Sequence, residues 1–226
     1  FLDKINYVDC SFCTTSPDIL KFPKKNRVFY IPNPADNSFE NLNIDSKKYF
    51  KNDVFFAISH GVHRGNLKKG KFDQREKFID KLIKKTPNIK YDLYGLKNIQ
   101  PIWADNFKVA ISKAKMGLNL SQGKSIKYYS SDRITQLIGN GLLTFIDKKT
   151  QLNDFFKNDE VIFYNDVNDL SKKIIKYKNS NILRNKIAKK GMIKYHKYMN
   201  SKLVAEFMIN KSFDINHKKK FFWENK

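Results

Sequence analysis

A short polar segment between two apolar ones contains the side chains that could bind a phosphate group. An apolar stretch at residues 116–120 is typical of a buried strand, and a polar loop leads from it to Ser130–Arg133. This pattern predicts a helix that Ser130-Ser131-Asp132 can cap. The free amides and positive dipole end of that helix would lie beside the Arg133 guanidinium. Helix N-terminal amides and a forked guanidinium are both good phosphate ligands. Gln136 follows on the same helix and could hydrogen-bond a hydroxyl group.

The elements that would position these side chains alternate regularly along the chain. Strands are predicted at residues 28–31, 54–59, 89–94, 116–120, 142–146 and 161–164, and helices at 73–85, 107–115, 131–138, 167–177, 182–198 and 201–209. The strands are short, continuously apolar runs, which is typical of a parallel sheet that helices cover on both faces. We therefore expect an α/β fold with a Rossmann-like sheet. In such sheets the carboxyl edge of the strands carries the ligand site.

Composition is consistent with a globular chain and leaves three kinds of anionic partner open. The 226 residues are 41% hydrophobic and carry a formal net charge of +22, which would suit nucleic acid, an anionic membrane or an anionic substrate. Only five of the 44 basic residues are arginines, and the rest are lysines: the arginines are Arg27, Arg64, Arg75, Arg133 and Arg184. A dedicated phosphate-binding surface usually holds more arginine, so solvated lysine faces are favoured over a nucleic-acid surface.

Cysteine and histidine are too few for an obvious metal centre. Cys10 and Cys13 form the only cysteine pair, and His60 and His63 form a second pair far along the chain. A zinc site that combines the two pairs is an alternative, but two buried thiols in a reducing cytoplasm are the simpler interpretation. We therefore predict no metal and no cofactor.

Several segments of the chain resemble GT-B glycosyltransferases. The resemblance covers about residues 28–209, and it rests on the order and spacing of four segments: Val28-Phe-Tyr-Ile-Pro-Asn-Pro-Ala-Asp36, Ser131-Asp-Arg-Ile-Thr-Gln136 with Gly141-Leu-Leu143, Val161 to Leu170, and Gly191-Met-Ile-Lys-Tyr-His196. The first is similar to the segment that links the two domains, and the second to the donor-binding helix of group 1 enzymes. The CgeB-like spore maturation proteins form the branch it resembles most.

This resemblance implies the carboxyl-terminal half of a GT-B architecture, the half that binds a nucleotide-diphosphate sugar. Residues 1–50 would then hold the end of the amino-terminal domain and the linker, residues 51–211 the Rossmann-like nucleotide-sugar domain, and residues 212–226 a basic tail. A chain that starts at Phe1 is expected to begin partway through a larger protein. The implied activity is transfer of a hexose-like sugar to a hydroxyl of a glycan or a lipid-linked acceptor, in the cytoplasm or at the inner face of the cell membrane.

The resemblance also assigns donor-binding residues. Together with the residue-based argument, the assigned set is Gly61, His63, Arg64, Lys71, Gly95, Tyr128, Ser130, Ser131, Arg133 and Gln136. Arg64 and one lysine of its loop would hold the donor phosphates, Gly61 would allow close approach of the backbone, and Gly95 would lie near the base.

Alternatives remain for several of these residues. The loop that carries His63 and Arg64 could be a basic surface loop without a ligand, and Tyr128 could stack on the base or fill the core. The family usually has Glu where this chain has Gln136, and the catalytic residues remain unknown. The basic, aromatic tail could contact an anionic membrane, but a disordered end is the simpler interpretation. A basic nucleic-acid-binding module and an inactive nucleotide-binding scaffold remain alternative functions.

Overall fold

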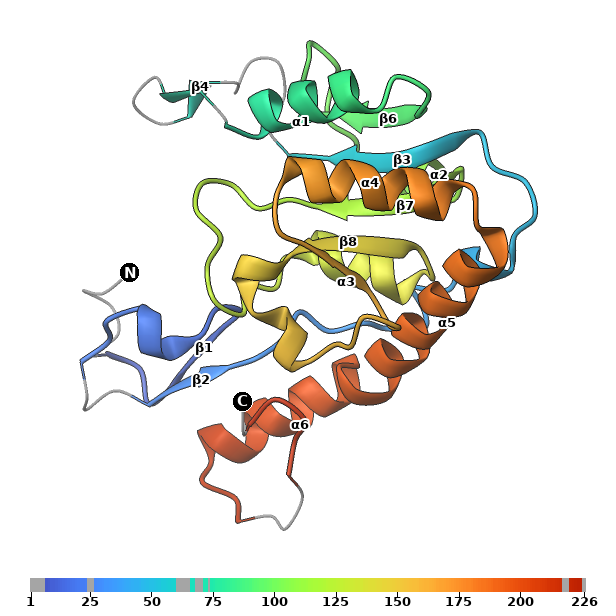
Figure 1. The fold of residues 1–226 in the computed structure, drawn as a ribbon. Coiled ribbons are helices and arrows are strands. Elements are labelled where there is room, and N and C mark those ends of the chain that lie inside the picture. Colours follow the sequence, from blue (N-terminus) through green and yellow to red (C-terminus); the bar gives the residue numbers. More distant parts are fainter. Residues whose placement is uncertain are drawn as a thin grey trace.

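The structure is a computed structural model, and it describes residues 7–23, 27–59, 66–67, 71–72, 74–216 and 220–224, with backbone alone for 66–67 and 71–72. Its centre is a five-stranded sheet in which every neighbouring pair is parallel (Figure 1). In spatial order the strands are β6 (Tyr91–Tyr94), β3 (Asn52–Ala57), β7 (Ala114–Asn119), β8 (Leu143–Asp147) and β9 (Ile162–Tyr164). The predicted α/β fold with a parallel sheet is confirmed.

The continuous apolar strands are buried on both faces of the sheet. In β3, Val54 and Phe56 point into one core cluster, while Phe55 and Ala57 point into another. Alternate side chains of a strand face opposite sides, so an uninterrupted apolar run is stable only between two covering layers.

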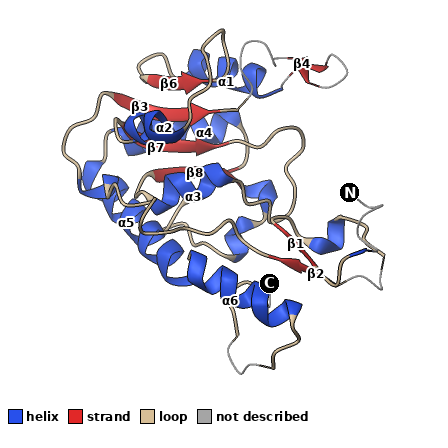
Figure 2. Cartoon of the chain, turned by 180° about the vertical axis from the view of Figure 1, so that it is seen from behind, coloured by secondary structure: helices blue, strands red, loops and turns tan. Residues whose placement is uncertain are grey.

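Those two layers are formed by helices of different parts of the chain. The helices α1 (Gln74–Lys85) and α4 (Val167–Lys178) cover one face, whereas α2 (Ala104–Ile111) and α3 (Asp132–Gly139) cover the other (Figures 1 and 2). Long helix α5 (Asn181–Tyr198) contacts both α3 and α4, and α6 (Ser201–Ser212) follows it along the lower flank in Figure 1. The final two helices therefore pack on one flank of the domain.

The sheet has a topological switch point between β3 and β7. From β3 the chain crosses to β6 on one side, and it then returns past β3 to form β7 on the other side. The two crossovers lie on opposite faces, so the loops after β3 and β7 diverge and leave a crevice between them. This crevice lies at the carboxyl ends of both strands.

The helix before β7 was predicted too far along the chain. It spans Ala104–Ile111 rather than residues 107–115, because Ala114 already pairs with Asn52 of β3. Lysine and alanine favour helix locally, but the parallel ladder decides the conformation of residues 113–115.

The segment before the sheet packs against the domain. Strands β1 (Ser11–Cys13) and β2 (Val28–Tyr30) form a separate parallel pair. After β2 the polar linker is tied to the end of α3, where the Asn140 side chain accepts from the Leu42 amide at 3.1 Å and its carbonyl from the Ile44 amide at 2.9 Å. Ile44 is 1% exposed, so the linker contributes to the core of the domain.

The basic tail is not the disordered end that its composition suggests, at least over residues 220–224. Phe221 and Trp223 are each 3% exposed and pack against the Phe207 ring of α6. Aromatic burial outweighs the charge of the flanking lysines, because each ring removes a large apolar area from water. Phe221 and Trp223, which could have reached a membrane surface, are therefore covered by protein, and Phe222 is partly buried. No helix in the described parts of the chain is long and apolar enough to cross a bilayer.

Candidate functional site

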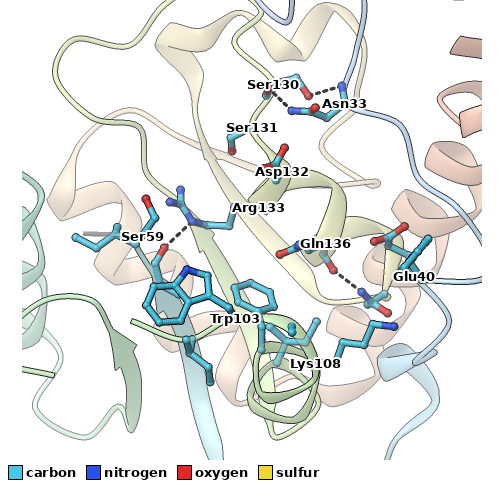
Figure 3. A pocket seen from close by; sticks show the side chains of 18 of the residues that line it. Asn33, Glu40, Ser59, Trp103, Lys108, Ser130, Ser131, Asp132, Arg133 and Gln136 are labelled. Carbon is cyan, nitrogen blue, oxygen red and sulfur yellow. Dashed lines mark hydrogen bonds between the residues drawn. The ribbon is translucent and has the colours of Figure 1, made fainter. Parts of the chain in front are cut away.

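A cleft of about 870 Å³ opens at the switch point of the sheet (Figure 3). It receives residues from the ends of β3 and β7, the first turns of α3, the segment before α2 and the linker. Residues that line it include Asn33, Glu40, Ser59, Arg75, Trp103, Lys108, Ser121, Ser131, Asp132, Arg133 and Gln136. The volume falls within the range of ordinary small-molecule sites, which is about 300–1,000 Å³.

Arg133 spans the two strand ends that define the switch point. Its Nε donates to the carbonyl oxygen of Ala57 at 2.8 Å, and its Nη1 donates to the carbonyl oxygen of Leu120 at 3.2 Å. The guanidinium also lies over the Phe56 ring, 5.1 Å from its centroid. These contacts hold a permanent positive charge at the carboxyl edge of the sheet, where the sequence predicted it.

The helix that carries Arg133 begins without the predicted side-chain cap. Ser131 is the N-cap residue, but its side chain does not cap the helix, and its hydroxyl instead donates to Asn119 Oδ1 at 3.2 Å. The cap prediction was therefore wrong, because the amide of Asn119, at the end of β7, offers the hydroxyl a competing acceptor. The Ile134 amide bonds to the Ser131 carbonyl at 3.0 Å. A first turn without a side-chain cap keeps backbone amides available to an anion.

Ser130 connects the site to the linker. Its hydroxyl accepts from the Asn33 amide at 3.1 Å, and its carbonyl accepts from Asn33 Nδ2 at 2.6 Å (Figure 3). The Ser130 amide in turn donates to the Thr14 carbonyl at 2.8 Å. These bonds engage both backbone groups and the hydroxyl, so Ser130 fixes the shape of one wall of the cleft.

Tyr128 belongs to the core rather than to the cleft. It is 4% exposed, its ring packs on Phe155 and Tyr30, and its hydroxyl donates to Asp154 Oδ2 at 2.6 Å. Burial, and then the Asp154 carboxylate, raise the pKa of Tyr128 to about 12. Of the two alternatives for this residue, the structure supports core packing, and the neighbouring Tyr129 lines the cleft instead.

Gly95 lies directly after β6, where a tight turn needs its positive φ of 77°. Its amide donates to the carbonyl of Ile99 at 3.1 Å, and it is not among the residues that line the cleft. Gly61, His63 and Arg64 lie outside the described residues. Lys71 belongs to the two-residue strand β5 (Lys71–Phe72), but its side chain is also outside the description. Their proposed roles stay predictions.

Four side chains of the cleft were not found from the sequence. Arg75, 6% exposed in the first turn of α1, adds a second guanidinium, and Trp103, 60% exposed, adds an aromatic surface before α2. Glu40 accepts from the Asp36 amide at 2.8 Å, and Lys108 lies over the Phe39 ring. The rarity of arginine in this chain is the one sequence signal that could have singled out Arg75. The other three lie in the site only because the linker and α2 pack beside it.

No group of three or more His, Cys, Asp or Glu side chains converges as a metal site within the described ranges. Cys10 and Cys13 are free and half-buried. Cationic groups and backbone amides are thus the anion ligands that the described residues bring to the cleft.

The model of one protein family, described as glycosyl transferase-like, matches residues 74–210 of this chain. The chain belongs to this family. The match includes α1, every strand of the sheet except β3, and most of α6, so it contains Arg75, Trp103, Arg133 and Gln136 of the cleft. No curated protein matches the sequence.

Solved structures of glycosyltransferases share the fold of this glycosyl transferase-like chain at low sequence identity. A mutant of S. aureus TarM in complex with Fondaparinux, alpha-GlcNAc-glycerol and UDP is 15% identical, with a TM-score of 0.62 over 93% of this chain and 45% of TarM. Sucrose-phosphate synthase from Thermosynechococcus elongatus is 12% identical, with a TM-score of 0.63 over 95% of this chain and 60% of the synthase. T4 phage BGT in complex with UDP and Mn²⁺ is 12% identical, with a TM-score of 0.53 over 95% of this chain and 77% of that chain. The chain spans less than half of TarM and about three fifths of the synthase. The fold is that of a GT-B carboxyl-terminal domain.

Gln136 has a distinct position in this glycosyl transferase-like domain. It lies one turn after Asp132 on α3, lines the cleft, and its backbone carbonyl accepts from Asn140 Nδ2 at 2.8 Å (Figure 3). Its side-chain amide can both donate to and accept from a hydroxyl group, but it has no charge. A hydroxyl-bearing ligand in the cleft would therefore meet a neutral partner at this position.

Proposed function

We propose that this chain is the donor-binding part of a GT-B glycosyltransferase of the CgeB-like branch. It would transfer a hexose-like sugar from a nucleotide-diphosphate sugar to a hydroxyl of a glycan or a lipid-linked acceptor. The observation that carries the proposal is the Arg133 guanidinium, which bridges the ends of β3 and β7 beside an uncapped helix N-terminus.

The chemistry of transfer explains why such a group is useful. As the bond from the sugar's anomeric carbon to the diphosphate oxygen breaks, negative charge develops on the leaving diphosphate. Donors that are already in position stabilise this charge more in the transition state than in the ground state. Arg133 supplies the fixed charge, and the first-turn amides of α3 supply hydrogen bonds.

The remaining walls of the cleft suit the rest of the donor. Gln136 would bond a ribose hydroxyl, and the exposed ring of Trp103 offers a surface on which a base or a sugar can stack. Stacking of a base on an aromatic side chain contributes about 1–3 kcal/mol in nucleic-acid complexes. Donor binding would therefore depend on three elements, α3, the segment before α2 and the ends of β3 and β7.

The alternative of a nucleic-acid-binding module finds less support in the structure. It needs arginines and aromatic residues gathered on one face. Arg184 is 2% exposed and donates to the Tyr177 carbonyl at 3.1 Å, and Arg27 pairs with Asp214 near the carboxyl terminus. Arg133 and Arg75 are the described arginines that meet in one site.

Calorimetric titration tests the proposal. We expect UDP to bind the chain with one-to-one stoichiometry and with an affinity that changes little between about 50 and 200 mM salt. Duplex DNA of about 20 base pairs is titrated in the same way, because it is the ligand that the alternative function would bind. A module that binds the phosphate backbone would lose about 10³-fold or more in affinity over that salt range. Absent UDP binding, or DNA binding with that salt dependence, would refute the proposed function. In the full-length protein, UDP binding without turnover would indicate the inactive scaffold instead.

A further inference from the structure

A second hollow, of about 740 Å³, lies on the other side of the loop that follows β7. It is bounded by α1, by the amino end of α4 and by the loops after β7, β8 and β9, on the face of the sheet that α1 and α4 cover in Figure 1. We call it the lysine hollow, after four side chains that line it: Lys77, Lys81, Lys124 and Lys149. Ser121 lines both this hollow and the cleft, so one loop separates the two.

The lysines of the hollow carry positive charge that no salt bridge neutralises within the described residues. None of the four lysines forms a salt bridge or a side-chain hydrogen bond with any residue in the described ranges, whereas nearby Lys173 pairs with Asp169 at 2.8 Å. Two lysines, Lys77 and Lys81, are spaced one helical turn apart on α1. Like charges at this spacing destabilise a helix slightly, so helix formation alone does not explain them.

Two carboxylates also line the hollow, and both are engaged in hydrogen bonds. Asp147 accepts from the Lys149 amide at 2.9 Å and from the Ser125 hydroxyl at 2.6 Å. Asp166 caps α4 by accepting from the amides of Asn168 at 2.7 Å and Asp169 at 2.9 Å. Neither acid forms a salt bridge with a lysine of the hollow within the described residues, and four lysines against two aspartates leave an excess of positive charge around it.

A buried hydroxyl group at this hollow also lacks a partner. Tyr164, the last residue of β9, lines the hollow and is 2% exposed, and its hydroxyl has no hydrogen-bond partner among the described residues. Its ring lies against Phe78 of α1, 6.2 Å between centroids. A buried hydroxyl without a partner costs free energy. A bound acceptor atom would remove that cost once a shift of the neighbouring side chains lets it reach this oxygen, which is closed to water in the structure.

We propose that the lysine hollow is a second anion site, which binds a phosphate-type group while the donor occupies the cleft. Lysine ammonium groups bind phosphate as point charges, and the Tyr164 hydroxyl would donate one directed hydrogen bond. A phosphate group carried by the acceptor and a free phosphate ion share this chemistry. An acceptor as the source of this phosphate group rests on the proposed transferase function. In that case the shared Ser121 places the hollow one loop away from the cleft that holds the sugar donor.

Titration with inorganic tripolyphosphate in the presence of saturating UDP tests the site, because UDP blocks the cleft. The double variant Lys77→Gln/Lys81→Gln should weaken tripolyphosphate binding about tenfold or more. The matched control, Lys84→Gln/Lys85→Gln, removes the same charge from the same helix at exposed positions outside the hollow, and should change the affinity less than twofold. Tyr164→Phe should weaken binding several-fold without lowering stability, since its hydroxyl has no partner to lose among the described residues.

The outcomes distinguish specific binding in the hollow from general electrostatic attraction. They also test the second site independently of the proposed function. Equal losses in both double variants, no effect of Tyr164→Phe, or no tripolyphosphate binding would overturn the second site. If UDP does not bind but tripolyphosphate still depends on Lys77 and Lys81, the transferase proposal fails and the anion site stands. A phosphodiester-linked oligosaccharide that binds at least tenfold more tightly than tripolyphosphate supports the acceptor as source, and equal or weaker binding supports free phosphate.

Discussion

Replacement of Arg133 by lysine should show how much donor binding depends on the forked shape of this side chain rather than on its charge. A lysine ammonium keeps the positive charge, but it is a compact point charge on a flexible stem. It cannot reproduce the bond from Nε to the Ala57 carbonyl at 2.8 Å together with that from Nη1 to the Leu120 carbonyl at 3.2 Å. The substituted side chain would therefore be free to reorient, and the diphosphate would lose a donor that is fixed before it binds.

The size of the effect follows from the contacts that are lost. One charge-assisted contact to the donor corresponds to about 1.4 kcal/mol, and thus to a tenfold increase in the Kd for UDP. Arg133→Ala should weaken binding at least as much, because it removes the charge as well. Ala57 lines the cleft and Leu120 lines the lysine hollow, so water can replace the two lost bonds and we expect a stability loss of only about 1–2 kcal/mol.

Isothermal titration with UDP and urea unfolding measure the two effects on the same samples. Arg27→Lys is the matched control: its partner Asp214 is 77% exposed, and it lies outside the cleft. An exposed ion pair contributes at most about 1 kcal/mol, and Arg27 also donates to the Lys211 carbonyl. The control should therefore keep its UDP affinity and lose no more stability than Arg133→Lys. If Arg133→Lys and Arg133→Ala both fold and bind UDP within twofold of the unchanged protein, Arg133 does not contact the donor and the site assignment is wrong.

Two further predictions concern the packing and the acid stability of the fold. Gly191→Ala would drive a Cβ into the Glu160 carbonyl oxygen, so we expect a loss of about 1–3 kcal/mol or more in urea unfolding; an unchanged midpoint would contradict this packing. Hydrogen bonds from the Ser201 hydroxyl and then from Ser38 lower the pKa of Asp36 from 3.8 to about 2. The carboxylate therefore stabilises the fold above its ordinary pKa, and this stabilisation is lost as pH falls through about 2. Ser201→Ala should raise the pKa of Asp36 in a carboxyl NMR titration and shift acid unfolding to higher pH; an unshifted titration curve would refute this account.

The parts of the fold that could be predicted are those in which local pattern and burial agree. The apolar run that contains Val54 and Phe55 could only be a strand covered on both faces, and the structure confirms it. Arg133 could be placed at the ligand edge because it follows a strand and a polar loop in the first turn of a helix. In a parallel sheet that position is always at the carboxyl ends of the strands.

The predictions that failed involve residues whose side chains had a competing partner. The Ser131 hydroxyl bonds to Asn119 instead of capping its helix, and Tyr128 is buried against Phe155. Trp223, in the basic tail, packs in an aromatic cluster with Phe207 instead of belonging to a disordered end. Each of these partner residues is distant in the sequence or of a common residue type, so no local sequence pattern identifies it.

The sequence alone determined the class of fold and one fixed charge of the site, because apolar periodicity and a strand–loop–helix order are local properties that burial enforces. Tertiary structure alone decided which strands are neighbours, and with that which side chains meet. The placement of β7 beside β3 brings the Ala57 and Leu120 carbonyls to one guanidinium. The fold also brings α1 and the turn after β8 to one hollow, and so gathers Lys77 and Lys149, which are far apart in the chain. Which side chains meet depends on the free energy of packing the whole core, and no single segment of the sequence determines it.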